Sequence, residues 1–206
     1  ASTMGGMCMA EQLYENANLS SKDLKYLGSY STNTHAVKIA KQYRLSGIVS
    51  TINTACSSSA NAIILGSKLI KLGRVKRAIV GGVDSLGKFS INGFQSLRIL
   101  SKSACSPFDE NRSGLTLGEG SAYLILESED SIGVKNKYAE ILGYGNSNDT
   151  FHPTSLSEDG KGVVKCMNQA LKSSLINKKQ IDYINTHGTA TYNNDLTELT
   201  GINKVF

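Results

Sequence analysis

The sequence predicts an α/β fold, in which strands and helices alternate along the chain. Short runs rich in β-branched residues recur, and most of them end in glycine or small polar residues. Amphipathic helical patterns lie between these runs. Of the 206 residues, 40% are hydrophobic and 19% are charged, a balance typical of a globular chain with a buried core. No low-complexity segment or short-period repeat interrupts the alternation, so the sequence indicates neither a disordered chain nor a solenoid.

The first elements follow this alternation up to a long loop at 104–120. Asn33 and Thr34 are cap candidates for a helix that Gly47 ends. The β-branched run "IVSTIN" predicts a strand. In this part of the chain we expect helices at 8–18, 33–46, 60–73 and 91–100, and strands at 48–53 and 77–84.

The rest of the chain repeats the pattern. Residues 121–128 and 138–149 have the composition of strands. The segment 158–175 begins as a loop and becomes an amphipathic helix, and 181–191 predict a strand that ends in a polar turn. Residues 193–206 begin a further helix. In such a fold we expect the chemistry at strand ends and helix starts.

Charge and cysteine usage exclude several classes of function. The net charge is +5, but lysine and arginine are scattered and aromatic residues make up only 7%, so no nucleic-acid surface is indicated. An acidic protein partner fits the basic balance better. The spacing of the four cysteines matches neither a zinc site nor a disulfide framework. With no apolar run long enough to span a membrane, we expect a cytoplasmic protein with reduced thiols and no metal.

The segment "TACSSS" places Cys56 between a predicted strand and a predicted helix. A helix N-terminus carries partial positive charge and exposed N–H groups, so a thiol there ionises more readily and can have oxyanion donors beside it. The alternative is a small buried residue that fills space at a turn, because unpaired cysteine is among the most buried residue types. The local sequence leaves both interpretations open.

A second polar turn favours the first interpretation. In "NTHGTATYNND", His187 follows a predicted strand and lies beside Gly188, in a turn that can project an imidazole and hydroxyl groups into a cleft. A cysteine and a histidine far apart in sequence can meet in a fold and act together as nucleophile and base.

Together with these turns, two further stretches make the chain resemble the β-ketoacyl-[acyl-carrier-protein] synthases. These are condensing enzymes of the thiolase fold that extend fatty-acid or polyketide chains. The matching stretches occur in the family's order and cover nearly the whole chain. They are "TACSSSANAI", "AIVGGVDSL", "CSPFDENRSGLTLGEGSAYLILE" and "THGTATYNND".

The resemblance implies a thiolase-like layered α-β-α fold, present here in incomplete form. Residues 1–135 would form the N-terminal half with the nucleophile, and 136–206 the start of the C-terminal half with the first histidine. It also implies a chain about half as long as a complete enzyme. A second histidine, the lysine before it and a glycine-rich loop would then follow residue 206, so we expect the isolated chain to be inactive and poorly stable.

The resemblance also implies a reaction, decarboxylative condensation. Cys56 would take an acyl group from acyl carrier protein, and His187 would help to decarboxylate the malonyl unit. No bound cofactor is implied, because the substrates arrive on the carrier's phosphopantetheine arm. A homodimer, or a heterodimer with a related synthase subunit, is the implied assembly.

Further residues receive weaker roles from the same resemblance. Thr154, Thr189 and Thr191 would hold the phosphopantetheine arm. Phe94 would line the acyl pocket, or else be a core aromatic residue. Ala190 departs from the family, which usually has glycine there. In the long loop, structural roles in ion pairs and turns are implied for Asp109, Arg112 and Glu119.

Three alternative functions differ in whether they retain acyl transfer to Cys56 and the condensation step. One is a thiolase-fold acyltransferase that primes chains or hydrolyses thioesters without condensation. Another is a non-catalytic partner subunit that sets chain length, although such subunits typically lack the cysteine. A papain-like protease has a similarly wide cysteine–histidine separation, but its signature around the cysteine is absent.

Overall fold

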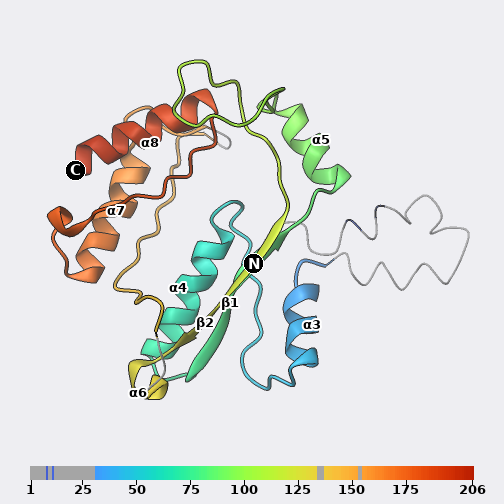
Figure 1. The fold of residues 1–206 in the computed structure, drawn as a ribbon, viewed down its shortest axis with the longest axis vertical. Helices are drawn as coiled ribbons and strands as arrows, with labels where there is room; N and C mark the ends of the chain where they lie inside the picture. Colours follow the sequence, from blue (N-terminus) through green and yellow to red (C-terminus); the bar gives the residue numbers. More distant parts are fainter. Residues whose placement is uncertain (1–7, 9–10, 12–30, 134–136, 153–154) are drawn as a thin grey trace, which may run out of the picture. The chain divides into compact units, whose positions relative to one another are not determined.

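The computed structural model describes residues 8, 11, 31–133, 137–152 and 155–206 (Figure 1). The chain forms two compact units: residues 1–93 with 118–137, and residues 94–117 with 138–206. Each unit is described below by itself. The units are interleaved along the chain, so they do not test the predicted division after residue 135. The predicted helix at 8–18 lies almost entirely outside the described residues.

The first unit contains an antiparallel pair of strands, β1 (Arg77–Asp84) and β2 (Gly120–Glu127). Arg77 lies opposite Glu127, with which it forms an ion pair, and Asp84 lies opposite Gly120. Both strands were predicted from their β-branched composition, and both are confirmed within one residue.

Helices lie on both sides of this pair. On one side, α4 (Ser58–Lys71) packs against β1. A Cβ on Gly66 would lie only 2.5 Å from Cγ1 of Val80, so glycine at this position permits the close approach. On the other side lies α3 (Thr34–Gln42), shown in blue in Figure 1. The predicted helices at 33–46 and 60–73 are confirmed with small shifts at their ends.

Two shorter helices complete the description of this region. The helix α6 (Glu129–Ile132) follows β2. The helix α5 (Lys88–Ser96) begins in the first unit, three residues before the predicted start at 91. Its first turn explains the shift, because the Glu11 carboxylate accepts hydrogen bonds from the N–H groups of Lys88 and Phe89, each at 2.8 Å.

The second unit is built around α7 (Lys161–Ser174) and α8 (Tyr192–Val205), which pack against each other. The contact is close at Gly201, where a Cβ would lie 2.6 Å from the side chain of Val163. A 3₁₀-helix, η1 (Lys178–Gln180), follows α7. Both α-helices agree with the predicted amphipathic helix in 158–175 and the further helix predicted for 193–206.

Other predicted strands form no ladder within the described residues. Residues 48–53, 138–149 and 181–191 carry no strand assignment there. At Tyr144 and Asn146 the backbone N–H groups donate instead to side chains of α7, Ser173 Oγ and Gln169 Oε1. Composition predicts an extended backbone, but a ladder also requires a neighbouring strand, which one segment's composition cannot supply.

Candidate active site

Cys56 lies in a tight turn that leads into α4. Ser57 is the N-cap residue of this helix, so the thiol sits directly before the helix start. Ala55 has a φ of 51°, a left-handed conformation that non-glycine residues seldom adopt. Such a conformation reverses the chain between an extended segment and a helix, and sites that expose a nucleophile often use one.

Hydrogen bonds from within the same few residues hold this turn. The Ser57 and Ser58 N–H groups donate to the carbonyls of Thr54 and Ala55, at 3.3 and 3.0 Å. The buried Ser58 hydroxyl accepts from the Thr54 N–H at 2.8 Å and donates to the Ala55 carbonyl at 2.7 Å. Asn61 donates to Thr54 Oγ1 at 2.9 Å. The Ser57 and Ser58 amides are therefore engaged within the turn.

The Cys56 side chain is exposed and forms no disulfide. The buried-filler alternative for this residue is thus wrong. The first turn of α4 contains no acidic side chain, and its basic residues, Lys68 and Lys71, lie in the last turn. The helix itself therefore places no carboxylate beside the thiol in its first turn.

In the second unit, a carboxylate holds the backbone of the His187 turn. Glu198, on α8, accepts hydrogen bonds from the N–H groups of His187 and Gly188 at 2.7 and 2.9 Å. Gly188 has a φ of 51°, a conformation that glycine adopts without steric cost, and a Cβ there would lie 3.0 Å from Thr186 Oγ1 and 3.3 Å from Pro107 Cβ, so a larger residue would be strained at this position. The His187 side chain is exposed.

A second carboxylate, Asp195, fixes the end of the same turn. It is 1% exposed and accepts hydrogen bonds from the N–H groups of Ala190 (3.1 Å) and Phe108 (2.8 Å). The Arg112 guanidinium lies 3.7 Å from it and stacks over the Tyr192 ring. Asp195 thus joins the loop that contains Phe108 and Arg112 to the start of α8, and Arg112 has the predicted ion-pair role.

The hydroxyl groups of the turn lie next to each other. Thr189 Oγ1 and Thr191 Oγ1 are 2.7 Å apart, and both residues are half-buried. The Cys105 thiol donates to the Thr189 carbonyl at 3.6 Å. These contacts present a pair of hydroxyls beside His187. The contact of Thr189 and Thr191 with a phosphopantetheine arm stays a prediction.

Two other predicted residues lie elsewhere. Thr154 falls outside the described residues. Phe94 is half-buried on α5, and its role in an acyl pocket stays a prediction. Asp149 accepts hydrogen bonds from the backbone N–H (3.0 Å) and hydroxyl (2.7 Å) of Ser157, and these hold the Asp149 pKa below its usual value.

The candidate nucleophile and the candidate histidine therefore come from different units of the chain. Cys56 belongs to the first unit, and His187, Thr189 and Thr191 belong to the second. Sequence reasoning found these residues but missed the roles of Asp195 and Glu198. A signal for them existed, because acidic residues in the first turns of a helix that follows a histidine turn can accept that turn's N–H groups.

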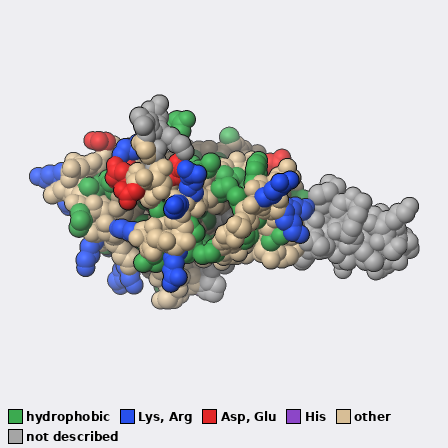
Figure 2. Space-filling view, turned by 90° about the horizontal axis from the view of Figure 1, so that it is seen from below, with side chains coloured by type: hydrophobic (Ala, Val, Ile, Leu, Met, Phe, Trp, Pro, Cys, Tyr) green, Lys and Arg blue, Asp and Glu red, His purple; other side chains and the backbone are tan. Residues whose placement is uncertain are grey.

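Helix hydropathy and metal-ligand geometry point to no further kind of site in the described part of the chain. Lysine and arginine side chains are distributed among apolar and polar ones on the face in Figure 2. Within the described ranges, no helix has the length and hydropathy to cross a bilayer. The same part of the chain contains no cluster of three or more histidine, cysteine or acidic residues placed to hold a metal ion.

Comparison with known proteins connects both turns to one family. Residues 1–131 match the family model for the beta-ketoacyl synthase N-terminal domain, and residues 138–206 match that for the C-terminal domain. Among curated relatives, 3-oxoacyl-[acyl-carrier-protein] synthase 2 of Rhizobium meliloti is 38% identical over 77% of this chain and 40% of its own length.

Solved structures agree with the family match. A ketosynthase in complex with its chain length factor, from Xenorhabdus doucetiae, has a TM-score of 0.89 and 35% identity. The match covers 100% of this chain and 51% of the ketosynthase chain. A type II polyketide synthase acyl-carrier protein in complex with its ketosynthase has a TM-score of 0.85 and 32% identity, over 90% of this chain and 47% of that one. The predicted thiolase-like α/β fold, present in part, is confirmed.

Proposed function

Because the chain belongs to the β-ketoacyl synthase family, we propose that the protein condenses acyl groups with malonyl units in fatty-acid or polyketide elongation. The chain spans about half the length of these relatives or less. The proposal therefore concerns the whole protein to which this chain contributes the nucleophile and the first histidine. One observation carries it: the exposed Cys56 thiol at the start of α4.

The first step is a transfer of the acyl group. The Cys56 thiolate attacks the carbonyl carbon of an acyl thioester on acyl carrier protein, and the carrier thiolate leaves and takes a proton. The new thioester joins the acyl group to Cys56 Sγ. The positive end of α4 favours the thiolate that begins this step.

The second step forms the carbon–carbon bond. The malonyl thioester on a second carrier loses CO2, and the bond electrons form an enolate whose oxygen is stabilised by hydrogen bonds, one of them from His187. The enolate carbon attacks the acyl carbonyl on Cys56, and the C–S bond breaks to release the thiolate. Thr154, Thr189 and Thr191 hold the carrier's arm, and Phe94 lines the acyl pocket.

The proposal also includes the protein's partners and its location in the cell. The substrates arrive on acyl carrier protein, so no further cofactor is required. The protein acts in the cytoplasm as a dimer, either with itself or with a related synthase subunit. Complexes of a ketosynthase with its carrier protein and with a chain length factor, found among the relatives, support these two kinds of partner.

Mass spectrometry of the complete protein tests the proposal. After incubation with an acyl-carrier thioester, we expect one acyl adduct on the peptide that contains Cys56, and release of CO2 when malonyl carrier is added. An adduct without CO2 release would favour the non-condensing acyltransferase. A complete protein that never forms the adduct would favour the non-catalytic chain-length partner.

A further inference from the structure

One side of α7, the orange helix in Figure 1, carries a row of lysines. From residue 161 to residue 181 the sequence has five lysines and no aspartate or glutamate. An α-helix turns by about 100° per residue, so Lys161, Lys165 and Lys172 lie within about 40° of one another. All three are exposed, and Val163, which packs against α8, lies on the opposite side of the helix. Lysines that are scattered in the sequence therefore form one lysine face on the helix.

Little of the charge on this lysine face is neutralised. Lys161 forms an ion pair with Asp159, in which Nζ and Oδ2 are 2.6 Å apart. Lys165 and Lys172 form no ion pair with a described residue. Like charges four residues apart on a helix repel each other, so the row does not stabilise α7. A helix face that only meets solvent commonly mixes both signs of charge, whereas this one does not.

A large apolar side chain lies at the end of the same helix. Leu175 is the C-cap residue of α7 and is 91% exposed. Its φ of 58° lies in the left-handed region, where glycine is the usual residue at a helix end. Leucine at this position strains the backbone and also exposes apolar surface to water. Because glycine would satisfy the fold better, the position of Leu175 points to a function of its side chain.

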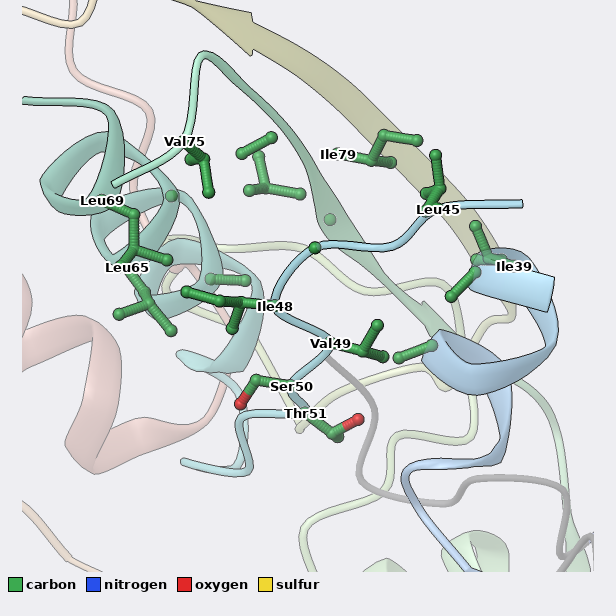
Figure 3. A pocket seen from close by; sticks show the side chains of 18 of the residues that line it. Ile39, Leu45, Ile48, Val49, Ser50, Thr51, Leu65, Leu69, Val75 and Ile79 are labelled. Atoms are coloured by element: carbon green, nitrogen blue, oxygen red, sulfur yellow. The ribbon is translucent and has the colours of Figure 1, made fainter. Parts of the chain in front are cut away.

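The apolar groove of the first unit has the opposite character (Figure 3). Its volume is about 430 Å³, and α3, α4 and both strands line it. Among the described residues that line it, Arg77 alone is a lysine or arginine. An apolar groove disfavours charged groups. The lysine face, in the second unit, is the better match for an anionic partner.

We propose that the lysine face and Leu175 together dock the protein on an anionic phospholipid surface. The ammonium groups lie among the lipid phosphates, and Leu175 enters the apolar layer beneath them. The helix stays at the surface, because its apolar side packs against α8. The inference goes beyond the proposed condensation and does not depend on Cys56.

Other anionic partners fit this surface less well. A nucleic acid would leave Leu175 without a contact, and α7 offers no aromatic side chain on which a base could stack. Protein interfaces are enriched in arginine and aromatic residues and depleted in lysine, whereas the cations here are all lysines. A lipid surface provides many phosphates without a fixed geometry, which suits flexible ammonium groups.

Co-sedimentation of the complete protein with lipid vesicles tests the proposal. Vesicles of phosphatidylglycerol and phosphatidylcholine in equal parts should bind the protein at low ionic strength, and vesicles of phosphatidylcholine alone should not. Binding should fall about 10-fold or more in about 1 M salt, because salt screens exposed charges. Cys56→Ala should bind as the wild type does. Equal binding to both kinds of vesicle, or binding to neither, would overturn the proposal.

A matched pair of charge reversals locates the docking surface. Lys165→Glu combined with Lys172→Glu should lower binding about 10-fold or more. Lys38→Glu combined with Lys41→Glu changes the net charge equally, at exposed positions of α3, and should lower binding several-fold less. Equal losses for the two pairs would mean that net charge alone attracts the protein, and the proposal would be wrong.

A second matched pair tests the apolar contact. Leu175→Gly should lower binding about 3-fold or more and should leave the Tm unchanged or raised, because glycine suits the left-handed position. Leu72→Gly, at the 73% exposed end of α4, should leave binding unchanged. Poly-glutamate that binds as tightly as the anionic vesicles, with no effect of Leu175→Gly, would indicate an acidic polypeptide and overturn the proposal.

Discussion

The turns that carry Cys56 and His187 are held in opposite ways. Around Cys56 the bonds come from neutral groups between Thr54 and Asn61. Around His187 the N–H groups of the turn donate to carboxylates on α8, and one of these carboxylates, Asp195, also accepts a hydrogen bond from a loop more than 70 residues earlier in the sequence. The nucleophile's turn is therefore a local structure, whereas the histidine's turn depends on tertiary packing. Substitutions in the two turns should differ accordingly.

The largest expected effect is chemical and leaves the local structure intact. In the complete protein, Cys56→Ala removes the acyl acceptor but none of the hydrogen bonds described for its turn. Condensation should fall by about 10⁴-fold or more, because the nucleophile acts with the rest of the site as a unit. Turnover of acyl-carrier substrate measures this. Near-wild-type activity would remove Cys56 from the mechanism.

The next effect should break the histidine's turn. Asp195→Ala leaves the N–H groups of Ala190 and Phe108 without their acceptor and leaves Arg112 without its buried partner. Loss of a buried ion-pair partner costs about 3 kcal/mol or more. Urea unfolding of the complete protein measures the change, with Asp182→Ala, at an exposed position, as the control.

The matching substitution in the nucleophile's turn is Ser58→Ala. The buried hydroxyl of Ser58 bridges the Thr54 N–H and the Ala55 carbonyl, so its removal should cost about 1–2 kcal/mol. Ser59→Ala, at an exposed neighbouring position, should change the free energy of unfolding little. A loss for Ser58→Ala as large as that for Asp195→Ala would contradict the distinction between local and tertiary support.

Acid should affect the second unit through Asp149. Its pKa is lowered by the Ser157 hydrogen bonds, so the folded state favours the carboxylate. The resulting stabilisation is present above the ordinary pKa of an aspartate and is lost as the pH falls through the folded-state value. The difference in urea midpoint between wild type and Asp149→Asn should therefore shrink from pH 6 toward about pH 3. A constant difference would show that the charge contributes nothing.

The smallest effect concerns Ala190, which is fully buried with a φ of 60°. Glycine would relieve about 1–2 kcal/mol of left-handed strain. Two effects oppose this gain: the folded state loses a buried methyl group, worth about 0.8 kcal/mol, and glycine raises the conformational entropy of the unfolded chain. We expect Ala190→Gly to shift the free energy of unfolding by less than about 1 kcal/mol. Thermal unfolding measures this, and a large change of either sign would mean that the turn itself rearranges.

The sequence predicted the elements that depend on residues close to one another in the chain. The helices α4 and α7 follow from amphipathic patterns, and a helix was also predicted where α8 lies. The placement of Cys56 before α4 follows from a strand-like run that ends in small polar residues. The strands β1 and β2 were each predicted from composition, but their pairing with each other was not. Residues 48–53 have equally strong β propensity and form no ladder in the described part, because pairing depends on a neighbour.

The candidate site shows the same limit. His187, Thr189 and Thr191 could be identified from one short segment. The roles of Asp195 and Glu198 could not, because each depends on which N–H groups the fold brings to its carboxylate. The departure at Ala190 was visible in the sequence, but only the backbone shows that it occupies a left-handed position.

The cap of α5 has a consequence for the order of folding. The carboxylate that receives the first N–H groups of this helix, Glu11, is separated from Lys88 by 77 positions in the sequence. Closing a loop of that length costs conformational entropy before the contact repays it. The first turn of α5 should therefore form late, after α4 and the β1–β2 pair have brought the two segments together. A chain that begins after residue 11 should lack this turn even when the rest of the first unit has folded.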